Sequence, residues 1–281
     1  MSGPRNITRR LPPTRRVVKF KANHILILVV LLMAGTAGLL FAINNRLVKK
    51  SPAIHSTSAP HIGSLPERPG DSRSYNEVRA GIEAERIALS SRYRKATNPA
   101  QKVEIINRAR DALTQSISTE LFPFWYGTAW DFNGTTETPG QGKIACGYFV
   151  STVLRDSGLR VERAKLAQQA SENIILSLTR EAQIKRFRRA AISDFVDAVK
   201  QWGPGLYVIG LDIHTGFIIN ISDEVYFIHS SYIGPFAVVR ERAIESKILS
   251  ASKYRVIGKV LADDQLIMKW LMGEEVATRS A

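Results

Sequence analysis

Apolar residues recur with the spacing of an α-helix between residues 75 and 120. The first stripe repeats every three, four or seven positions and consists of Tyr75, Val78, Ile82, Leu89 and Tyr93. The second stripe consists of Val103, Ile106, Leu113 and Ile117. Asn98 and Pro99 separate the two stripes, and they suit the N-cap and the first position of a new helix. The pattern predicts a helical hairpin over residues 75–120 that packs through its apolar stripes.

Further helices are predicted in the middle of the chain, after an aromatic and glycine-rich stretch. Residues 145–157 carry apolar side chains on one helical face, and Gly158 suits the end of that helix. Residues 164–190 are basic and helix-prone. A short helix is expected from a cap at Ser193 to Trp202, where a Gly-Pro-Gly sequence stops it.

The last third of the chain is rich in β-branched and aromatic residues, which favour strands. Predicted strands cover residues 206–211, 214–221, 225–231, 236–242 and 253–261. A closing amphipathic helix is predicted over residues 265–272, within a C-terminal segment 263–281. Helices followed by a meander of strands indicate an α+β fold, with helices packed on an antiparallel sheet.

Residues 25–43 stand apart from this pattern because nineteen consecutive residues carry no charge. As a helix they would span about 28 Å, close to the thickness of a bilayer's hydrocarbon core. Seven Lys or Arg precede the segment and three follow it closely, so the positive-inside rule places residues 1–24 in the cytoplasm. A cleaved signal peptide is the alternative, although its apolar region is normally shorter. We expect a single transmembrane helix in the inner (cytoplasmic) membrane, with the globular part in the periplasm or cell-wall space.

The basic charge of the chain is concentrated in this N-terminal part. The formal net charge is +14, from 39 Lys and Arg against 25 Asp and Glu. Residues 1–50 hold ten basic residues and no acidic one, which leaves 29 basic against 25 acidic residues in 51–281. A nearly neutral globular part argues against a nucleic-acid partner. Residues 44–74 are rich in Ser, Pro and Gly and are expected to link the membrane segment to the domain.

The chain contains a single cysteine, Cys146, at the start of the predicted helix 145–157. A lone cysteine is often a small buried hydrophobe. At a helix N-terminus, however, unpaired N–H groups and the positive end of the helix dipole favour the thiolate. His214 and His229 are the two histidines of the globular region, and they stand in neighbouring predicted strands. A cysteine that faces an oriented histidine is the arrangement of a papain-like thiol hydrolase.

The sequence around these residues resembles the NlpC-type superfamily of cell-wall cysteine peptidases. The resemblance runs through GTAWDFNG (127–134), CGYFVSTVLRDSGL (146–159), VERAKLAQQAS (161–171), GPGLYVIGLDIHTGFIIN (203–220) and VYFIHSS (225–231). The family reads Asp-Cys-Ser-Gly-Phe-Val at the nucleophile, followed by a His-Val-Gly-Ile strand and an Ile-His-Ala strand. The match covers roughly residues 121–235 and implies a papain-like domain over residues 121–262.

The resemblance also implies roles for three residues and a reaction. Cys146 corresponds to the nucleophile, His214 to the base, and His229 to the residue that orients the base. The implied reaction is hydrolysis of amide bonds in peptidoglycan stem peptides through a thioester intermediate. No cofactor is expected for this chemistry.

Other positions near the implied nucleophile are candidates for binding substrate or the oxyanion. The backbone N–H of Gly147 is one such candidate. Trp130 aligns with a family tyrosine whose hydroxyl lies near the thiol, and Tyr126 is the candidate to replace that hydroxyl. Ala145 stands where the family has an acid before the nucleophile, a departure that concerns the substrate more than the fold.

Several alternatives stay open at this point. Cys146, His214 and His229 could instead hold zinc, although no closely spaced pair such as Cys-x-x-Cys supports such a site. The domain could be a non-catalytic, envelope-anchored scaffold that binds in the same cleft. The basic run KRFRR (185–189) could bind an anionic polymer, although a solvated helix face is the more common explanation. Asp212 could assist His214 or be an ordinary charge at the end of a strand.

Overall fold

The structure is a computed structural model that describes residues 72–280 of the chain. The basic tail 1–24, the expected transmembrane segment 25–43 and the linker up to residue 71 lie outside the described residues. Within residues 72–280, no helix combines the length and the apolar character that a membrane crossing requires.

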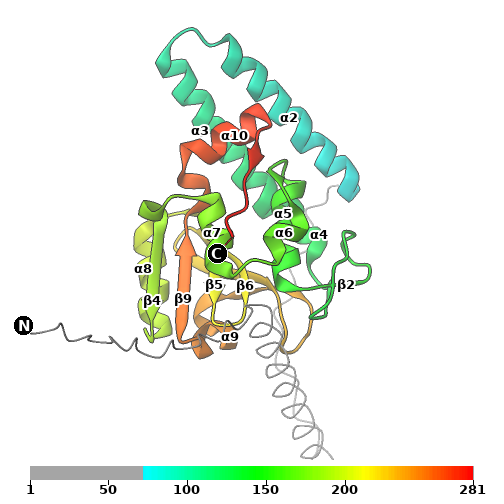
Figure 1. Ribbon diagram of the computed structural model, residues 1–281, viewed down its shortest axis with the longest axis vertical. Helices are drawn as coiled ribbons and strands as arrows, with labels where there is room; N and C mark the ends of the chain where they lie inside the picture. Colours follow the sequence, from blue (N-terminus) through cyan, green and yellow to red (C-terminus); the bar gives the residue numbers. More distant parts are fainter. Residues whose placement is uncertain (1–71, 281) are drawn as a thin grey trace, which may run out of the picture. The chain divides into compact units, whose positions relative to one another are not determined.

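A six-stranded antiparallel sheet forms the centre of the described part, in the order β4-β9-β5-β6-β7-β8 (Figure 1). Its strands are β4 (Ile184–Arg188), β5 (Gly205–Leu211), β6 (Thr215–Ile221), β7 (Glu224–Ser230), β8 (Val238–Arg242) and β9 (Tyr254–Gly258). Five of these strands, all except β4, agree with the strands expected from the sequence. The predicted α+β fold with an antiparallel sheet is confirmed.

Both faces of the sheet are covered, which explains the composition of its central strands. In β5, Leu206 and Val208 belong to one hydrophobic core, whereas Tyr207 and Ile209 belong to a second core. Successive side chains of a strand point to opposite faces of the sheet. A strand between two cores is therefore apolar throughout, as residues 206–211 are, and does not alternate between apolar and polar residues.

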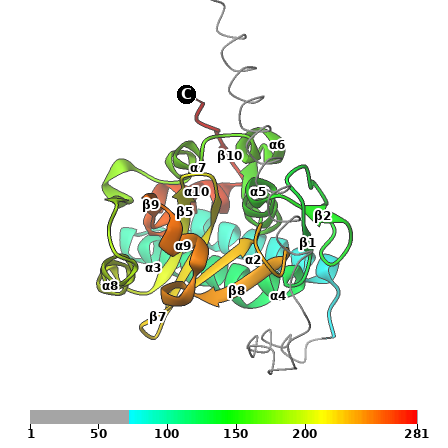
Figure 2. The ribbon, with the colours of Figure 1, turned by 90° about the horizontal axis from the view of Figure 1, so that it is seen from below.

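The larger core lies between the sheet and most of the helices. These helices are α2 (Tyr75–Lys95), α3 (Pro99–Gln115), α4 (Phe122–Trp125), α5 (Cys146–Asp156), α6 (Arg163–Ala167), α7 (Ser171–Leu178) and α10 (Asp264–Met272). Figure 1 shows the α2–α3 hairpin extending away from the sheet, with α10 beside it. The second core lies under α8 (Ile192–Trp202) and α9 (Lys247–Ala251), and α9 is seen in front of the strands in Figure 2.

The predicted helical hairpin is present, and its caps explain its boundaries. Ser74 and Glu77 form a reciprocal capping box at the start of α2. The side chain of Asn98 accepts a hydrogen bond of 2.9 Å from the backbone N–H of Gln101, as expected for the N-cap of α3. α3 continues through a π-helical turn, η1 (Ser116–Leu121), into α4. The apolar stripes of the hairpin, including Val78 and Leu113, are part of the larger core of the domain.

Residues 164–190, which the sequence indicates to be helix-prone, are helical only in their first part. The segment contains α6, α7 and a 3₁₀ turn, η2 (Glu181–Gln183), and it ends in strand β4. The basic run 185–189 therefore lies mostly on an edge strand and not on a helix. Pairing with β9 decides its conformation, which is a tertiary contact that local propensity does not record. Charged side chains on an edge strand also oppose pairing with another chain.

The basic side chains of β4 have partners on the domain's own surface. The ammonium group of Lys185 lies 4.6 Å from the ring centroid of Trp202. Arg186 forms ion pairs with Glu172 and Glu181. A second local expectation is also corrected, because α8 begins after Ala191 as its N-cap and not after Ser193.

Two short parallel pairs fix loops beside the main sheet. β1 (Ala129–Trp130) pairs with β2 (Lys143–Ile144), and β3 (Arg160–Val161) pairs with β10 (Glu275–Val276). The remaining 3₁₀ turns are η3 (Ala243–Glu245) and η4 (Val260–Ala262). β2 leads directly into α5, so the first of these pairs sets the position of Cys146.

Candidate active site

Cys146 is the first residue of α5, as the sequence predicted. Ala145 precedes it in an extended conformation and provides no side-chain cap, so the first N–H groups of the helix are not taken by a capping side chain. The hydroxyl of Ser230, at the end of β7, donates a 2.7 Å hydrogen bond to the carbonyl of Ile144. This bond ties the segment before the cysteine to the main sheet.

The thiol of Cys146 is half-buried and lies against the start of β6. The backbone N–H of Thr215, the residue after His214, donates a hydrogen bond to the sulfur, as do the N–H groups of Cys146 and Gly147. Burial raises the pKa of the Cys146 thiol, and the three N–H groups only partly oppose this effect. The expectation of a lowered pKa from the helix N-terminus alone is therefore wrong, because desolvation outweighs the backbone dipoles. In the resting site the thiol carries its proton at neutral pH.

A chain of hydrogen bonds joins two imidazoles to a carboxylate. His214 Nε2 lies 2.9 Å from His229 Nδ1, and His229 Nε2 lies 3.2 Å from Glu241 Oε1. His214 is 4% exposed and His229 is fully buried. The two predicted histidines are therefore in direct contact. Glu241 was not among the residues singled out in the sequence.

The register of the sheet explains how Glu241 reaches His229. Phe227 of β7 is paired with Glu241 of β8, and His229 is two residues further along β7. All three side chains thus face the same side of the sheet, with His229 and Glu241 as diagonal neighbours. The ring of His229 stacks on Phe227 with centroids 3.9 Å apart and an interplanar angle of 11°. This stack covers Gly216 of β6, where an added Cβ would lie 2.8 Å from His229 Cβ.

The ionised carboxylate at the end of this chain determines the tautomers of both imidazoles. Burial works to raise the pKa of Glu241, but hydrogen bonds from His229 and Ser246 outweigh it and hold the pKa below its ordinary value. An ionised carboxylate can only accept, so His229 must carry its proton on Nε2. His229 Nδ1 then accepts from His214 Nε2–H. The lone pair of His214 is left on Nδ1, the nitrogen not used in this chain.

Both imidazoles are held neutral in the folded protein. Burial lowers the pKa of His214 well below 6.5, and the neighbouring His229 lowers it further. Burial also lowers the pKa of His229, although Glu241 opposes this effect. The neutral thiol of Cys146 therefore lies at the N-terminus of α5, next to the start of β6. The neutral imidazole of His214 belongs to the residue directly before β6.

Aromatic side chains form one side of the site. The ring of Tyr232 packs edge-on against His214, with centroids 5.1 Å apart. Burial raises the pKa of Tyr232, and the negative charge of a Cys146 thiolate raises it further. Trp130 lies 6.4 Å from both Tyr232 and Phe236, measured between ring centroids. These three aromatic residues are here called the aromatic wall.

The structure separates the other candidate residues into two groups. Trp130 belongs to the aromatic wall, and Gly147 contacts the thiol through its N–H. Tyr126, however, packs against the larger core, where burial raises its pKa to about 12. Among the described residues, the tyrosine with an electrostatic link to Cys146 is Tyr232, which the sequence reasoning missed. The sequence feature that could have indicated Tyr232 is its position three residues after His229.

Two further expectations concern a glycine and an acid. Gly147 is required by packing, because an added Cβ would lie 2.3 Å from the carbonyl oxygen of Ala167. Asp212 accepts hydrogen bonds from the backbone N–H groups of Lys253 and Tyr254. Its carboxylate therefore fastens the start of β9, which agrees with the interpretation as a strand-end charge.

The geometry argues against the zinc alternative. His214 Nε2 and His229 Nδ1 face each other at hydrogen-bond distance, so these two nitrogens cannot both point at a common metal ion. In the part of the chain that the structure describes, no group of three or more His, Cys, Asp or Glu side chains could hold a metal ion.

The region holds a thiol at a helix start and two neutral imidazoles that are hydrogen-bonded to each other and to a carboxylate, which are groups that acyl transfer can use. Glu241 and Tyr232 complete what the sequence anticipated in Cys146, His214 and His229. Comparison with known proteins finds no matching family model, no matching curated protein and no matching solved structure.

Proposed function

We propose that the protein is an extracytoplasmic thiol hydrolase of the papain-like, NlpC type that cleaves amide bonds. The observation that carries the proposal is the hydrogen-bonded chain His214–His229–Glu241. Its first residue, His214, directly precedes Thr215, whose backbone N–H contacts the Cys146 thiol. A purely structural cysteine has no need of two buried imidazoles in tandem with an ionised carboxylate. Burying such groups is costly unless they are fully hydrogen-bonded.

The proposed reaction proceeds in two steps. His214 Nδ1 accepts the proton of the Cys146 thiol as the sulfur attacks the carbonyl carbon of the amide. The backbone N–H groups of Cys146 and Gly147 can stabilise the developing oxyanion. The amine leaves with the proton from His214, and a thioester remains on the sulfur. Water then attacks the thioester with His214 again as base, which releases the acid and restores the thiol.

The proposed substrate is a stem peptide of peptidoglycan, on the strength of the sequence resemblance. The aromatic wall is compatible with a substrate that presents apolar or ring-shaped groups next to the scissile bond. Phe132, which is 80% exposed, extends the aromatic surface beyond Trp130 along the chain. The expected membrane anchor at residues 25–43 would hold the enzyme at the cell-wall side of the inner membrane.

A second candidate function is a non-catalytic scaffold of the same fold, and one observation favours it. Burial raises the pKa of the Cys146 thiol, as it does for inert structural cysteines. In this alternative, the cleft binds the envelope peptide without cleaving it. In the hydrolase the thiol attacks the bound peptide, whereas in the scaffold the thiol does not react with it.

The decisive experiment uses the full chain in a nonionic detergent with purified cell-wall material as substrate. Because Cys146 is the single cysteine, a thiol-directed probe labels one known position. We expect the wild-type protein to release peptide fragments detectable by mass spectrometry, and prior alkylation to abolish their release. Cys146→Ser should lose turnover and still bind the cell-wall material. Full release by Cys146→Ser would reject the hydrolase in favour of another activity.

A pair of tyrosine variants provides a matched control for the position of the site. Tyr232→Phe removes the hydroxyl beside Cys146 and should lower turnover several-fold, because a polar group near the reacting thiol is lost. Tyr126→Phe makes the same chemical change against the core and should leave turnover unchanged. Equal effects of the two variants would contradict the assignment of Tyr232 to the site.

A further inference from the structure

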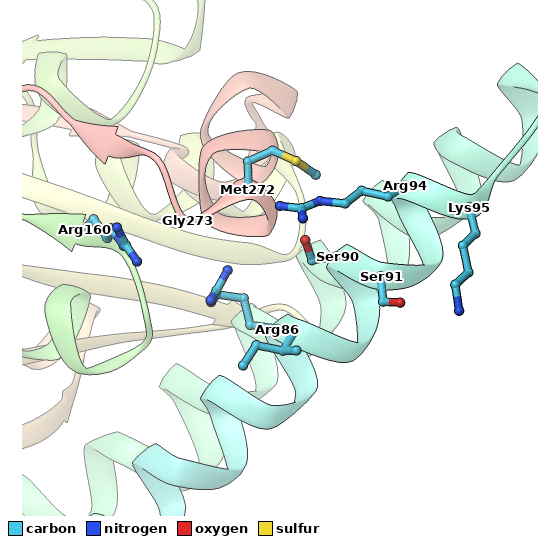
Figure 3. Close-up of a pocket in the computed structure, with 9 residues that line it drawn as sticks. Arg86, Ser90, Ser91, Arg94, Lys95, Arg160, Met272 and Gly273 are labelled. Atoms are coloured by element: carbon cyan, nitrogen blue, oxygen red, sulfur yellow. The ribbon is translucent and has the colours of Figure 1, made fainter.

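A cavity of about 420 Å³ lies between the C-terminal half of α2, strand β3 and the end of α10 (Figure 3). Four cationic side chains line it: Arg86, Arg94, Lys95 and Arg160. None of them belongs to the thiol site. They come from two separate segments of the chain, so tertiary packing and not a single charged helix face brings them together.

Arg86 forms the fixed part of this cavity. Its Nε and Nη2 donate to the carboxylate of Glu83 at 2.7 and 2.6 Å. Its Nη1 donates to the carbonyls of Trp270 and Leu271, at 3.3 and 3.2 Å. These carbonyls belong to the last turn of α10, whose C=O groups have no partner within the helix. Arg86 therefore joins α2 to α10 and has its charge compensated by Glu83.

The other three cations have no ion-pair partner in the described part of the chain. Among residues 72–280, Arg94, Lys95 and Arg160 form no ion pair, and all three are exposed. In Figure 3 the guanidinium group of Arg94 extends toward Met272, over the cavity, whereas Lys95 is directed away from it. Arg94 and Arg160 are thus the two guanidinium groups without an ion pair that can reach a ligand in the cavity.

Gly273 marks the point where two guanidinium groups converge. It ends α10 in the left-handed conformation, with φ of 64°. A Cβ at this position would lie 3.2 Å from Arg86 Nη1 and 3.6 Å from both Nε and Nη2 of Arg160. The two like charges therefore stand close together over the glycine, with only Glu83 to compensate them. Glu83 cannot neutralise both, so an anion at this position would be stabilised.

A hydroxyl without a hydrogen-bond partner in the described part of the protein also lines the cavity. Ser90 is 6% exposed, and its side chain makes no hydrogen bond within the described part of the chain. Figure 3 shows this hydroxyl on the same side of α2 as the Arg94 guanidinium group. Because this hydroxyl has no partner among the described residues, it is available to donate a hydrogen bond to a ligand in the cavity.

We propose that this cavity binds the phosphate group of an anionic organic ligand, held by Arg94, Arg160 and Ser90. Guanidinium groups bind phosphate oxygens in a bidentate fashion, and a hydroxyl can donate to a third oxygen. A phosphate, with three free oxygens and up to two negative charges, matches two guanidinium groups better than a single carboxylate does. Ile87 and Met272, which also line the cavity, provide apolar surface for the organic part of the ligand. The phosphate can come from a lipid headgroup or from a soluble phosphate ester.

The test is isothermal titration calorimetry of the full chain in a nonionic detergent. Inorganic pyrophosphate probes the soluble source. Short-chain phosphatidylglycerol probes the lipid source, with phosphatidylcholine of the same chain length as its control. Arg94→Gln and Arg160→Gln should each weaken the binding of the preferred probe about tenfold, since each removes a charged hydrogen-bond donor. Both residues are exposed and lack ion pairs, so the variants should keep the wild-type unfolding midpoint.

Arg92→Gln is the matched control, because Arg92 lies on the last turn of the same helix but does not line the cavity. It should bind each probe with wild-type affinity. Binding of pyrophosphate alone would identify a soluble ester, and preferential binding of phosphatidylglycerol would identify a lipid headgroup. The proposal is overturned if neither probe binds the wild-type protein, or if Arg92→Gln weakens binding as much as Arg94→Gln does.

Discussion

Polar side chains are paired in the thiol site but only in part in the cavity beside α2, which is lined by Arg86, Arg94 and Arg160 and is here called the arginine cavity. In the thiol site, His214 and His229 are buried and hydrogen-bonded to each other, and the chain ends on Glu241. In the arginine cavity, Arg94 and Arg160 are exposed and have no ion-pair partner among the described residues. The polar groups of the first site are paired without a ligand, whereas the second site has charges in excess that an added anion would compensate.

This difference follows from what each proposed site has to do. A base must present one particular lone pair in one direction before the substrate arrives, so its orientation has to be built into the fold. A site that binds a charged group gains affinity from cations that are not already paired inside the protein. Polar side chains that are hydrogen-bonded inside the protein thus indicate a site preorganised for chemistry. Charged side chains without an ion pair indicate a site that can bind a charged ligand.

The largest effect is expected from removing the base. His214→Ala should reduce turnover of cell-wall peptide by about 10⁴-fold, nearly as much as Cys146→Ser, because nucleophile and base act as a unit. The double variant should be no worse than either single variant. The rate of peptide release, measured by mass spectrometry, tests this. If His214→Ala kept its activity, His214 would not be the base, and the thiol site would no longer count as preorganised for chemistry.

A smaller loss is expected when the end of the hydrogen-bonded chain is changed. Glu241→Gln should reduce turnover by about 10²-fold, since the tautomers of both imidazoles are no longer imposed by a carboxylate. The acid limb of the pH–rate profile should also move to lower pH, because the protonated imidazole pair loses its stabilising charge. A purely structural role of Glu241 would lower activity without moving the limb.

Glu245→Gln is the control for this variant. Glu245 is a nearby exposed carboxylate that pairs with Arg242. Its replacement should leave both the turnover and the pH–rate profile unchanged. A shift of the profile in this control would mean that general surface charge, and not the contact with His229, sets the pH dependence.

The arginine cavity offers a comparison between a structural and a ligand-facing cation. Arg86→Gln should lower the free energy of unfolding by about 2 kcal/mol, because buried carbonyls of α10 and the Glu83 carboxylate lose their donor. Arg94→Gln should change it by less than about 0.5 kcal/mol, as is usual for an exposed side chain. Denaturant unfolding measures both. Equal destabilisation by the two variants would show that Arg94 also serves the fold.

The last effect is a gradual dependence of stability on pH. The pKa values of His214 and His229 are lowered in the folded protein, so the unfolded chain binds more protons below the ordinary value of 6.5. The free energy of unfolding should therefore be greatest above pH 6.5 and fall as the pH decreases, by up to about 1.4 kcal/mol per pH unit for each proton. Thermal unfolding between pH 8 and 5 measures this slope. His214→Phe should make it shallower, and a slope that persists unchanged would contradict the buried neutral pair.

The predictions from the sequence were most accurate where a local pattern has a single physical cause. The hairpin stripes, the Asn98 cap and the strands in the last third all follow from side-chain periodicity and backbone capping. The same reasoning failed at residues 184–188, whose basic composition resembles a helix and whose conformation is imposed by pairing with β9. Glu241 could not be found because it lies among other charged residues of β8, and only the register with β7 brings it to His229.

The amino-acid sequence alone determined the α+β class, the order of the elements and the position of Cys146 at a helix start. These depend on interactions between residues close together along the chain. Only the tertiary structure decided that burial raises the pKa of the thiol, that Glu241 orients both imidazoles, and that Arg94 and Arg160 face one cavity. Those properties depend on desolvation and on contacts between distant segments, and both exist only after the sheet and helices have packed together.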